Sequence, residues 1–269
     1  MLKGMTLGQY FPGDSLIHRL DPRTKILATI ALIAIVFVSQ GFTGFLLIAA
    51  FVLACAVSTK IHLKFLIRGL KPIFFIIVFT FILNLFFQTA GNELIRVGPV
   101  RITDQGLRMA SFMAVRLILL VVCSQLLTLT TSPIALTDGL ESLFRPLQKI
   151  HFPAHEIAMM MSIALRFIPT LMDEADKIMK AQKARGANFE TGSLIQRAKA
   201  MIPLLVPLFV GAFRRAEELA LAMDARCYRG GAGRTRMKQL KYGKIDLMAA
   251  LALVLLLAAV ILLNHFKVF

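Results

Sequence analysis

Two arginines with matching surroundings are the strongest candidates for a functional role. Ala184-Arg185-Gly186 ends the stretch EADKIMKAQKARG, and Ala225-Arg226-Cys227 ends the stretch RAEELALAMDARC. Aligned at a spacing of 41 residues, the two stretches share alanine, acidic and arginine positions, and both are rich in strong helix formers. A planar guanidinium with five donors can engage carboxylates and backbone carbonyls together. The pattern predicts two similar helices, each with an arginine at its tip that can bind a partner.

An ordinary capping role is the alternative for either motif taken alone. An arginine in the last helical turn complements the helix dipole, and a glycine directly after it takes the left-handed conformation that ends many helices. The presence of a second copy favours the binding role. The second copy has Cys227 where the first has Gly186, and a positive φ is costlier for a residue other than glycine.

The composition places these helices in a membrane protein. Of the 269 residues, 57% are hydrophobic and 17% are charged, with a mean hydropathy of +0.73, whereas an average soluble domain has about 25% charged residues. The net charge of +16 would suggest nucleic acid in a soluble protein. In so apolar a chain it fits cytoplasmic loops and anionic lipid or acidic protein surfaces instead. We therefore expect a polytopic membrane protein that binds no nucleic acid.

Five apolar stretches approach the roughly 20 residues that a membrane-spanning helix needs. Short basic segments precede the first stretch and join the second to the third, and basic residues near span ends mark the cytoplasm. The N-terminus is therefore predicted inside, the C-terminus outside, and the region from about 131 to 244 in the cytoplasm. The start of the chain has no pattern typical of a cleavable signal peptide. The five predicted spans are Ile26–Val38, Phe42–Val57, Pro72–Gln88, Leu107–Thr128 and Leu247–Leu263.

The long cytoplasmic region is predicted to form a helical domain. Its two apolar patches, Ile157–Pro169 and Met201–Phe213, have 13 residues each, which is about 20 Å of helix and too short to cross a membrane. We interpret them as buried or membrane-surface parts of long amphipathic helices, kinked or broken at Pro169, Pro203 and Pro207. No segment resembles a strand. The predicted fold is all-α, with four spans in 1–130, a helical cytoplasmic domain in 131–244 and a last span in 245–269.

Methionines give the long cytoplasmic helices a soft apolar side. Met159, Met160 and the nearby Ala164 are candidates for a groove that accepts a partner, because flexible thioethers adapt to different surfaces. Packing in the core is the alternative for any one of them.

Arg116 lies in the middle of the fourth predicted span. A charge at this depth usually faces a cavity, a partner or another span. Pairing inside the helix bundle is favoured over a direct transport role, with Asn84, Gln125 and Gln88 as candidate partners.

No pattern in the sequence predicts catalysis or a bound metal. The Gly230–Arg234 segment lacks the lysine of a phosphate-binding loop. His151 and His155 have no evident third ligand, and Pro153 separates them. The three cysteines have no metal or disulfide spacing. We expect no catalytic residues, no metal site and no cofactor in this chain.

The segment before the first span has a local physical interpretation. In His18-Arg19-Leu20-Asp21-Pro22-Arg23-Thr24-Lys25, Asp21 can cap the first helix and Pro22 suits its first position. Together with the paired Ala-Arg-Gly motifs, this segment resembles the transmembrane T component of energy-coupling factor transporters. The resemblance extends over essentially the whole chain.

The resemblance implies a multi-pass subunit of a bacterial or archaeal cell membrane without enzymatic activity of its own. Two cytoplasmic ATP-binding subunits would bind the two arginine-tipped helices and supply the ATP. A membrane-embedded S component would bind vitamins or other micronutrients and contact the apolar side of the coupling helices. The alternative is a self-contained secondary transporter, which would need ionisable or broken-helix sites near the middle of the bilayer.

Overall fold

The computed structural model describes residues 10–87, 92–97, 100–150, 152–187, 189, 193–230 and 239–266. The chain divides into two compact units. The first, here called the membrane unit, contains Gly8–Leu140 and Leu240–Phe269, and the second, the coupling unit, contains Glu141–Gln239. Each unit is described by itself.

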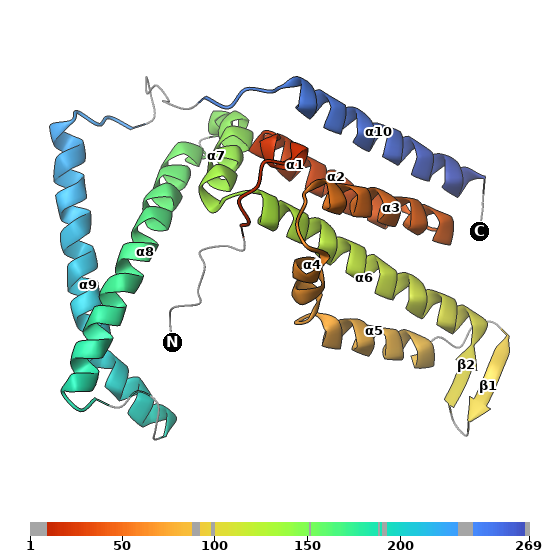
Figure 1. The fold of residues 1–269 in the computed structure, drawn as a ribbon, viewed down its shortest axis with the longest axis horizontal. Coiled ribbons are helices and arrows are strands. Elements are labelled where there is room, and N and C mark those ends of the chain that lie inside the picture. The colour runs from red at the N-terminus through yellow and green to blue at the C-terminus, as the bar shows by residue number, and fades with distance from the viewer. Residues whose placement is uncertain are drawn as a thin grey trace. The chain divides into compact units, whose positions relative to one another are not determined.

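The membrane unit is built from helices and one hairpin (Figure 1). In chain order its elements are α1 (Leu16–Arg19), α2 (Pro22–Val38), α3 (Phe42–Ser58), α4 (Leu63–Leu70), α5 (Phe74–Phe87), β1 (Glu93–Val97), β2 (Val100–Thr103), α6 (Asp104–Thr130) and α10 (Lys244–His265). The boundary between the units falls within α7 (Pro133–Phe144). The coupling unit continues with the 3-10 helix η1 (Arg145–Ile150), α8 (Ala154–Ala184) and α9 (Leu194–Ala225).

The predicted all-α class is confirmed, with one local exception. β1 and β2 pair antiparallel, with Arg96 opposite Arg101 and Val97 opposite Val100. The expectation that no segment forms a strand is therefore wrong here. The two extended segments are close neighbours in the sequence directly before α6, so pairing them carries little loop-closure cost.

The first and last membrane helices run parallel and are tied together at both ends. At the start, the buried Asp246 carboxylate accepts hydrogen bonds from the backbone N–H groups of Asp21 (2.9 Å) and Gly243 (2.7 Å). At the other end, the Asn264 side chain donates to the carbonyl of Val38 (2.8 Å) and accepts from the N–H of Gln40 (3.3 Å). The N-termini of α2 and α10 therefore lie on the same side of the unit.

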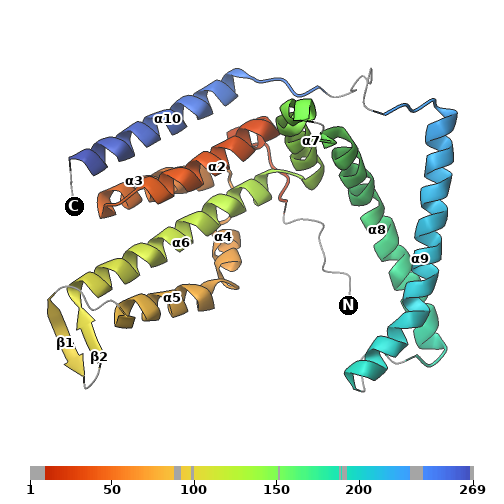
Figure 2. The same cartoon turned by 180° about the vertical axis from the view of Figure 1, so that it is seen from behind.

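The remaining helices alternate in direction between these two sides. α3 returns from the end of α2, the α4–α5 pair runs outward again, and α6 returns to the start of α2 (Figures 1 and 2). The Lys25 ammonium marks this return, because it donates to the carbonyl oxygens of Thr130 (2.8 Å) at the end of α6 and of His18 (3.0 Å) in α1. α2, α3, the α4–α5 pair and α6 thus alternate in direction, and α10 runs parallel to α2. Five successive membrane spans would have these directions.

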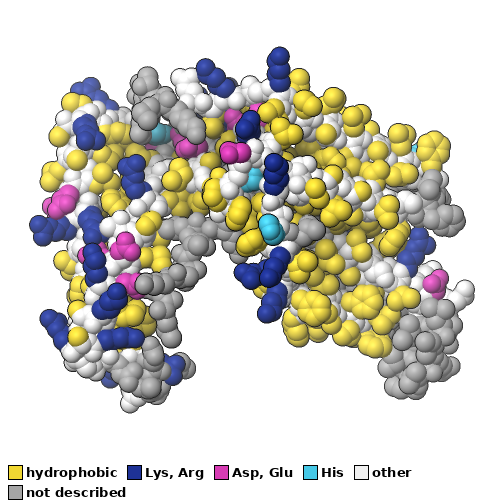
Figure 3. Space-filling model, viewed as in Figure 1, with side chains coloured by type: hydrophobic (Ala, Val, Ile, Leu, Met, Phe, Trp, Pro, Cys, Tyr) yellow, Lys and Arg dark blue, Asp and Glu magenta, His cyan; other side chains and the backbone are white. Residues whose placement is uncertain are grey.

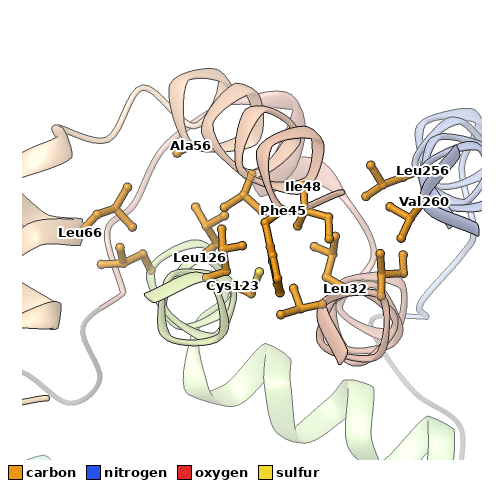
Figure 4. Close-up of a cluster of buried hydrophobic side chains, with 14 of the residues drawn as sticks. Leu32, Phe45, Ile48, Ala56, Leu66, Cys123, Leu126, Leu256 and Val260 are labelled. Carbon is orange, nitrogen blue, oxygen red and sulfur yellow. The ribbon is translucent and has the colours of Figure 1, made fainter. Parts of the chain in front are cut away.

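A single apolar core joins these helices (Figure 4). Phe45 and Ile48 of α3 lie at its centre, between α2 on one side and α6 on the other, and Leu66 extends it to α4. Inside a bilayer such side chains stabilise the unit through close van der Waals packing, because lipid tails are as apolar as the side chains themselves. Its buried members are Leu32, Ile35, Val36, Phe45, Ile48, Val52, Ala56, Ile61, Leu66, Leu119, Cys123, Leu126, Leu129, Leu256 and Val260.

Much apolar surface remains outside this core. Figure 3 shows hydrophobic side chains over the visible faces of α5 and α10, and a bilayer is the solvent that such faces require. By length and composition α6, α9 and α10 can each span a membrane, and α4 with α5 can do so as one bent pair. α2 and α3 have 17 residues each, about 25 Å of helix. The apolar patch Met201–Phe213 was expected to be too short to cross, but it lies within one continuous helix, α9, that is long and apolar enough to do so. The placement of α9 at the membrane surface stays a prediction.

The buried Asp246 makes a testable contribution to stability. Replacing Asp246 by Ala leaves the N–H groups of the buried Asp21 and of Gly243 without their acceptor, which costs roughly 2–3 kcal/mol. We expect the Asp246→Ala variant to unfold at least about 5 °C below the parent protein in detergent, measured by circular dichroism. The exposed Asp14 provides the control, because Asp14→Ala should leave Tm unchanged. Equal Tm values for the two variants would show that Asp246 does not tie α10 to α2.

Candidate partner-binding site

The two long helices of the coupling unit cross at matching positions of the sequence repeat. Arg215 of α9 forms an ion pair with Glu174 of α8, and each is the first residue of its repeat copy. Gly211 lies beside the same contact, where an added Cβ would come within 3.1 Å of the Glu174 carboxylate. A glycine one turn before Arg215 thus allows the close approach that the ion pair needs.

The crossing defines two arms of equal length. From Glu174 to Arg185, and from Arg215 to Arg226, the chain advances by eleven residues, or about 17 Å of helix. The two tips lie at opposite ends of the helix pair (Figures 1 and 2). None of the three prolines in these helices breaks its helix, although α9 is visibly bent (Figure 1).

The first tip has a complete backbone cap. α8 ends at Ala184, Arg185 is its C-cap, and Gly186 follows with φ +88°. The N–H groups of Gly186 and Ala187 donate to the carbonyls of Lys183 (3.0 Å) and Gln182 (2.9 Å). This is the Schellman arrangement, in which the chain itself satisfies the last carbonyls of the helix.

The second tip repeats this cap without a glycine. Cys227 has φ +55°, and the N–H groups of Cys227 and Tyr228 donate to the carbonyls of Asp224 (2.9 Å) and Met223 (3.1 Å). The cap therefore forms, and Cys227 adopts the left-handed conformation that glycine takes in the first copy. A residue with a Cβ pays about 1 kcal/mol for this conformation.

Both arginine side chains are exposed and unengaged. Residues 184–186 and 225–227 are all exposed. Neither guanidinium group forms a hydrogen bond or an ion pair with any other residue that the structure describes. Because the backbone caps already satisfy the helix ends, both guanidinium groups are available to a binding partner.

The predicted groove residues lie on an exposed part of α8. Met160 is 59% exposed, Ala164 is also exposed, and Met159 is half-buried. Sequence analysis missed a larger apolar surface on α9. There Ile202, Val206, Phe209 and Phe213 recur at helical spacing, are all exposed, and include a stacked pair of rings, Phe209 and Phe213. Their spacing of four, three and four residues was the signal, although it lies within a patch predicted to be buried or at the membrane surface.

The intramembrane Arg116 pairs inside the helix bundle. Its guanidinium donates to the carbonyl of Ser39 (3.3 Å) at the end of α2 and lies over the rings of Phe37 and Phe45. Of the candidate partners, Asn84 donates instead to the Thr80 carbonyl, and Gln125 makes no hydrogen bond to Arg116. Gln88 lies outside the described residues.

The segment before the first span has the predicted local structure. The Asp21 carboxylate caps α2 by accepting from the Arg23 N–H (2.9 Å), and the Arg23 side chain lies over the Tyr242 ring. The Lys25 ammonium is buried and donates to the carbonyls of His18 and Thr130.

The histidines do not form a metal site in the part of the chain that the structure describes. His155 bonds to Glu141 (3.0 Å), and His151 lies outside the described residues. The described residues contain no cluster of three His, Cys, Asp or Glu side chains able to hold a metal ion.

Comparison with known proteins adds to these observations. The family model described as "Cobalt transport protein" (CbiQ) matches residues 13–238. Proteins named "Energy-coupling factor transporter transmembrane protein EcfT" match nearly the whole chain. That of Thermosediminibacter oceani is 57% identical, over 93% of this chain and 94% of its own length. Those of Clostridium kluyveri and Bacillus subtilis are 53% and 46% identical, over 97% and 98% of this chain and 97% and 100% of their own lengths.

The chain belongs to the EcfT family. It is a multi-pass transmembrane component of an energy-coupling factor transporter, and the family implies that it works in an assembly with other components. Its relatives are named as transporter components and not as enzymes.

The two tips allow a matched test of the caps. Cys227→Gly should stabilise the end of α9 by about 1 kcal/mol, because glycine adopts a positive φ without strain. Gly186→Ala should destabilise the end of α8 by a similar amount, and its added Cβ meets no atom within 4 Å, so any effect is conformational. Hydrogen exchange of the Tyr228 and Ala187 amides measures each cap. The cap assignment is wrong if both substitutions change exchange in the same direction.

Proposed function

We propose that this chain is the coupling subunit of an ATP-driven importer, and that two cytoplasmic ATP-binding subunits bind its two arginine tips. The observation that carries this proposal is the pair of matched, exposed tips, each with an unpaired guanidinium at the end of an arm of the same length. Two similar binding sites on two similar subunits are the simplest partners for such a pair. ATP is bound by these subunits and this chain needs no cofactor.

The apolar faces of α8 and α9 are the proposed contact for a membrane-embedded S component, which carries the vitamin or other micronutrient. Met159, Met160 and Ala164 supply part of this surface, and the α9 side chains from Ile202 to Phe213 supply more. In the proposed mechanism, ATP binding moves the two tips. The crossing at Glu174 and Arg215 transmits that movement to the apolar faces, as rigid rods do.

The same proposal sets the orientation in the membrane. The N-terminus and the coupling unit face the cytoplasm, where the ATP-binding subunits are, and the C-terminus faces outside. The parallel α2 and α10 support an odd number of spans.

A self-contained secondary transporter is the weaker alternative. Such a protein needs free ionisable groups or broken helices near the middle of the bilayer. Arg116 is engaged with Ser39 and two aromatic rings, which favours a structural role for this charge.

The proposed attachment predicts the effect of reversing each tip charge. Arg185→Glu or Arg226→Glu should weaken binding of the ATP-binding subunits by roughly 2–5 kcal/mol, and the double variant should lose assembly because both attachments fail together. Loss of a purely capping arginine would cost only about 0.3–1 kcal/mol. Pull-down of the ATP-binding subunits and substrate uptake by vesicles measure the outcome.

The control for the tips is Arg214→Glu on the same helix. Arg214 is highly exposed and its only described partner is Glu218, one turn away, so this variant should assemble normally. Normal assembly and uptake in the Arg185→Glu, Arg226→Glu double variant would refute the proposed attachment.

The apolar surface predicts a separate defect. Ala164→Glu or Met160→Glu should release the S component while the ATP-binding subunits remain bound, because an unpaired charge in an apolar interface costs several kcal/mol. Ala198→Glu adds the same charge at an exposed alanine among polar residues of α9 and should keep both partners. Co-purification of each partner distinguishes these results. Equal loss of both partners in the Ala164→Glu variant would mean that this residue supports the fold of α8.

A further inference from the structure

The short helix α4 carries a row of basic side chains that the proposed coupling mechanism does not use. Lys64, Arg68 and Lys71 recur at spacings of four and three residues, so they lie on one face of the helix. All three are exposed, and none forms an ion pair with any residue that the structure describes. We call this row the α4 basic face.

The opposite face of α4 is fixed to the membrane unit. Leu66 is buried in the core shown in Figure 4, and it lies about 160° around the helix from Lys64 and Arg68. Gly69 allows α4 to approach α6 so closely that a Cβ there would collide with the Gln125 side chain. The basic face is therefore held in one direction, away from the core.

No acidic residue near α4 in the sequence can neutralise these positive charges. From residue 22 to residue 92 the sequence contains no Asp or Glu. A fourth cation, Lys60, is exposed directly before α4 and has φ +57°. Lys60 therefore adopts the left-handed backbone conformation, which costs a lysine more than it would cost a glycine.

Exposed apolar side chains lie beside these charges. Ile67, which is 67% exposed, and Phe65 flank the basic face on α4. The chain then bends by 59° into α5, whose Phe74 and Phe75 are also exposed. A ligand that satisfies both surfaces needs a negative head and long apolar tails.

We propose that the α4 basic face binds the phosphate headgroup of an anionic phospholipid, whose acyl chains lie along Ile67 and α5. Charge complementarity favours this ligand over a zwitterionic lipid, because clustered basic residues at a membrane surface attract anionic headgroups. It is favoured over an acidic protein surface because the cations are bordered by exposed apolar side chains on the adjoining helix. Lipid binding here anchors the membrane unit at the surface where its spans begin.

The absence of tryptophan from the chain permits a direct test. The Ile67→Trp variant of the full chain places a single fluorophore beside the basic face. After reconstitution into phosphatidylcholine vesicles, its quenching by brominated phosphatidylglycerol is compared with that by brominated phosphatidylcholine. We expect phosphatidylglycerol to bind about fivefold more tightly, as one or more cations near a headgroup would produce.

Matched double variants in the Ile67→Trp background identify the charges responsible. Lys64→Gln with Arg68→Gln should abolish the preference for phosphatidylglycerol. Lys241→Gln with Lys244→Gln removes two exposed cations next to α10 and should preserve it. Lys64→Arg with Arg68→Lys keeps both charges and should also preserve it, which separates a lost ligand from a misfolded helix.

Three results would overturn the proposal. Equal quenching by the two lipids in the Ile67→Trp protein would exclude a headgroup preference. Competition by millimolar glycerol phosphate would indicate a site for soluble phosphate esters. Loss of co-purifying protein subunits from the Lys64→Gln, Arg68→Gln variant, without a lipid preference in the Ile67→Trp protein, would identify an acidic protein as the ligand.

Discussion

A helix leaves its last backbone groups without partners of its own, and inside the hydrocarbon core of a membrane no water is available to satisfy them. Long-range side-chain contacts meet this requirement in the membrane unit. Asp246 accepts from the start of α2, Lys25 donates to the end of α6, and Arg116 and Asn264 donate to carbonyls at the end of α2. These contacts fix the directions of the helices, so the order of the spans follows from the chemistry of their ends.

The coupling unit meets the same requirement in a different way. Its two tips cap themselves through backbone hydrogen bonds around Gly186 and Cys227. The guanidinium group of the arginine next to each cap is consequently not needed to satisfy the backbone groups at the end of its own helix. A charged side chain that forms no contact within its own chain is available to bind another protein. This is the physical reason for proposing the partner contacts at the two tips and not along the membrane helices.

Features that depend on neighbouring residues could be predicted from the sequence. Asp21 and Pro22 start α2 as expected, the turn after Val38 joins two apolar helices, and both repeat copies end at their arginine. The outcome at Cys227 could not be decided from propensity, because the cost of a positive φ had to be compared with the hydrogen bonds that it permits. The structure resolves that comparison in favour of the cap.

Features that depend on distant residues could not be predicted. Asp246 and Asp21 are 225 positions apart, and nothing in either local sequence specifies the other. The described hydrogen-bond acceptor for Arg116 is the Ser39 backbone carbonyl, which carries no sequence signal, so a search among polar side chains did not find it. The Glu174–Arg215 pair was visible only as two aligned positions of a repeat. α9 is long and apolar enough to span a membrane, so its composition alone does not distinguish a spanning helix from one that lies on the membrane surface.

The crossing of α8 and α9 also constrains how this chain can change in evolution. Each tip is defined by a count of residues from one shared point, so a single insertion in an arm would move the arginine by 1.5 Å and turn it by about 100°. The arginine would then face a different direction while its own helix remained stable. A substitution that keeps the helix intact leaves this distance and direction unchanged, whereas a change in the length of an arm alters both.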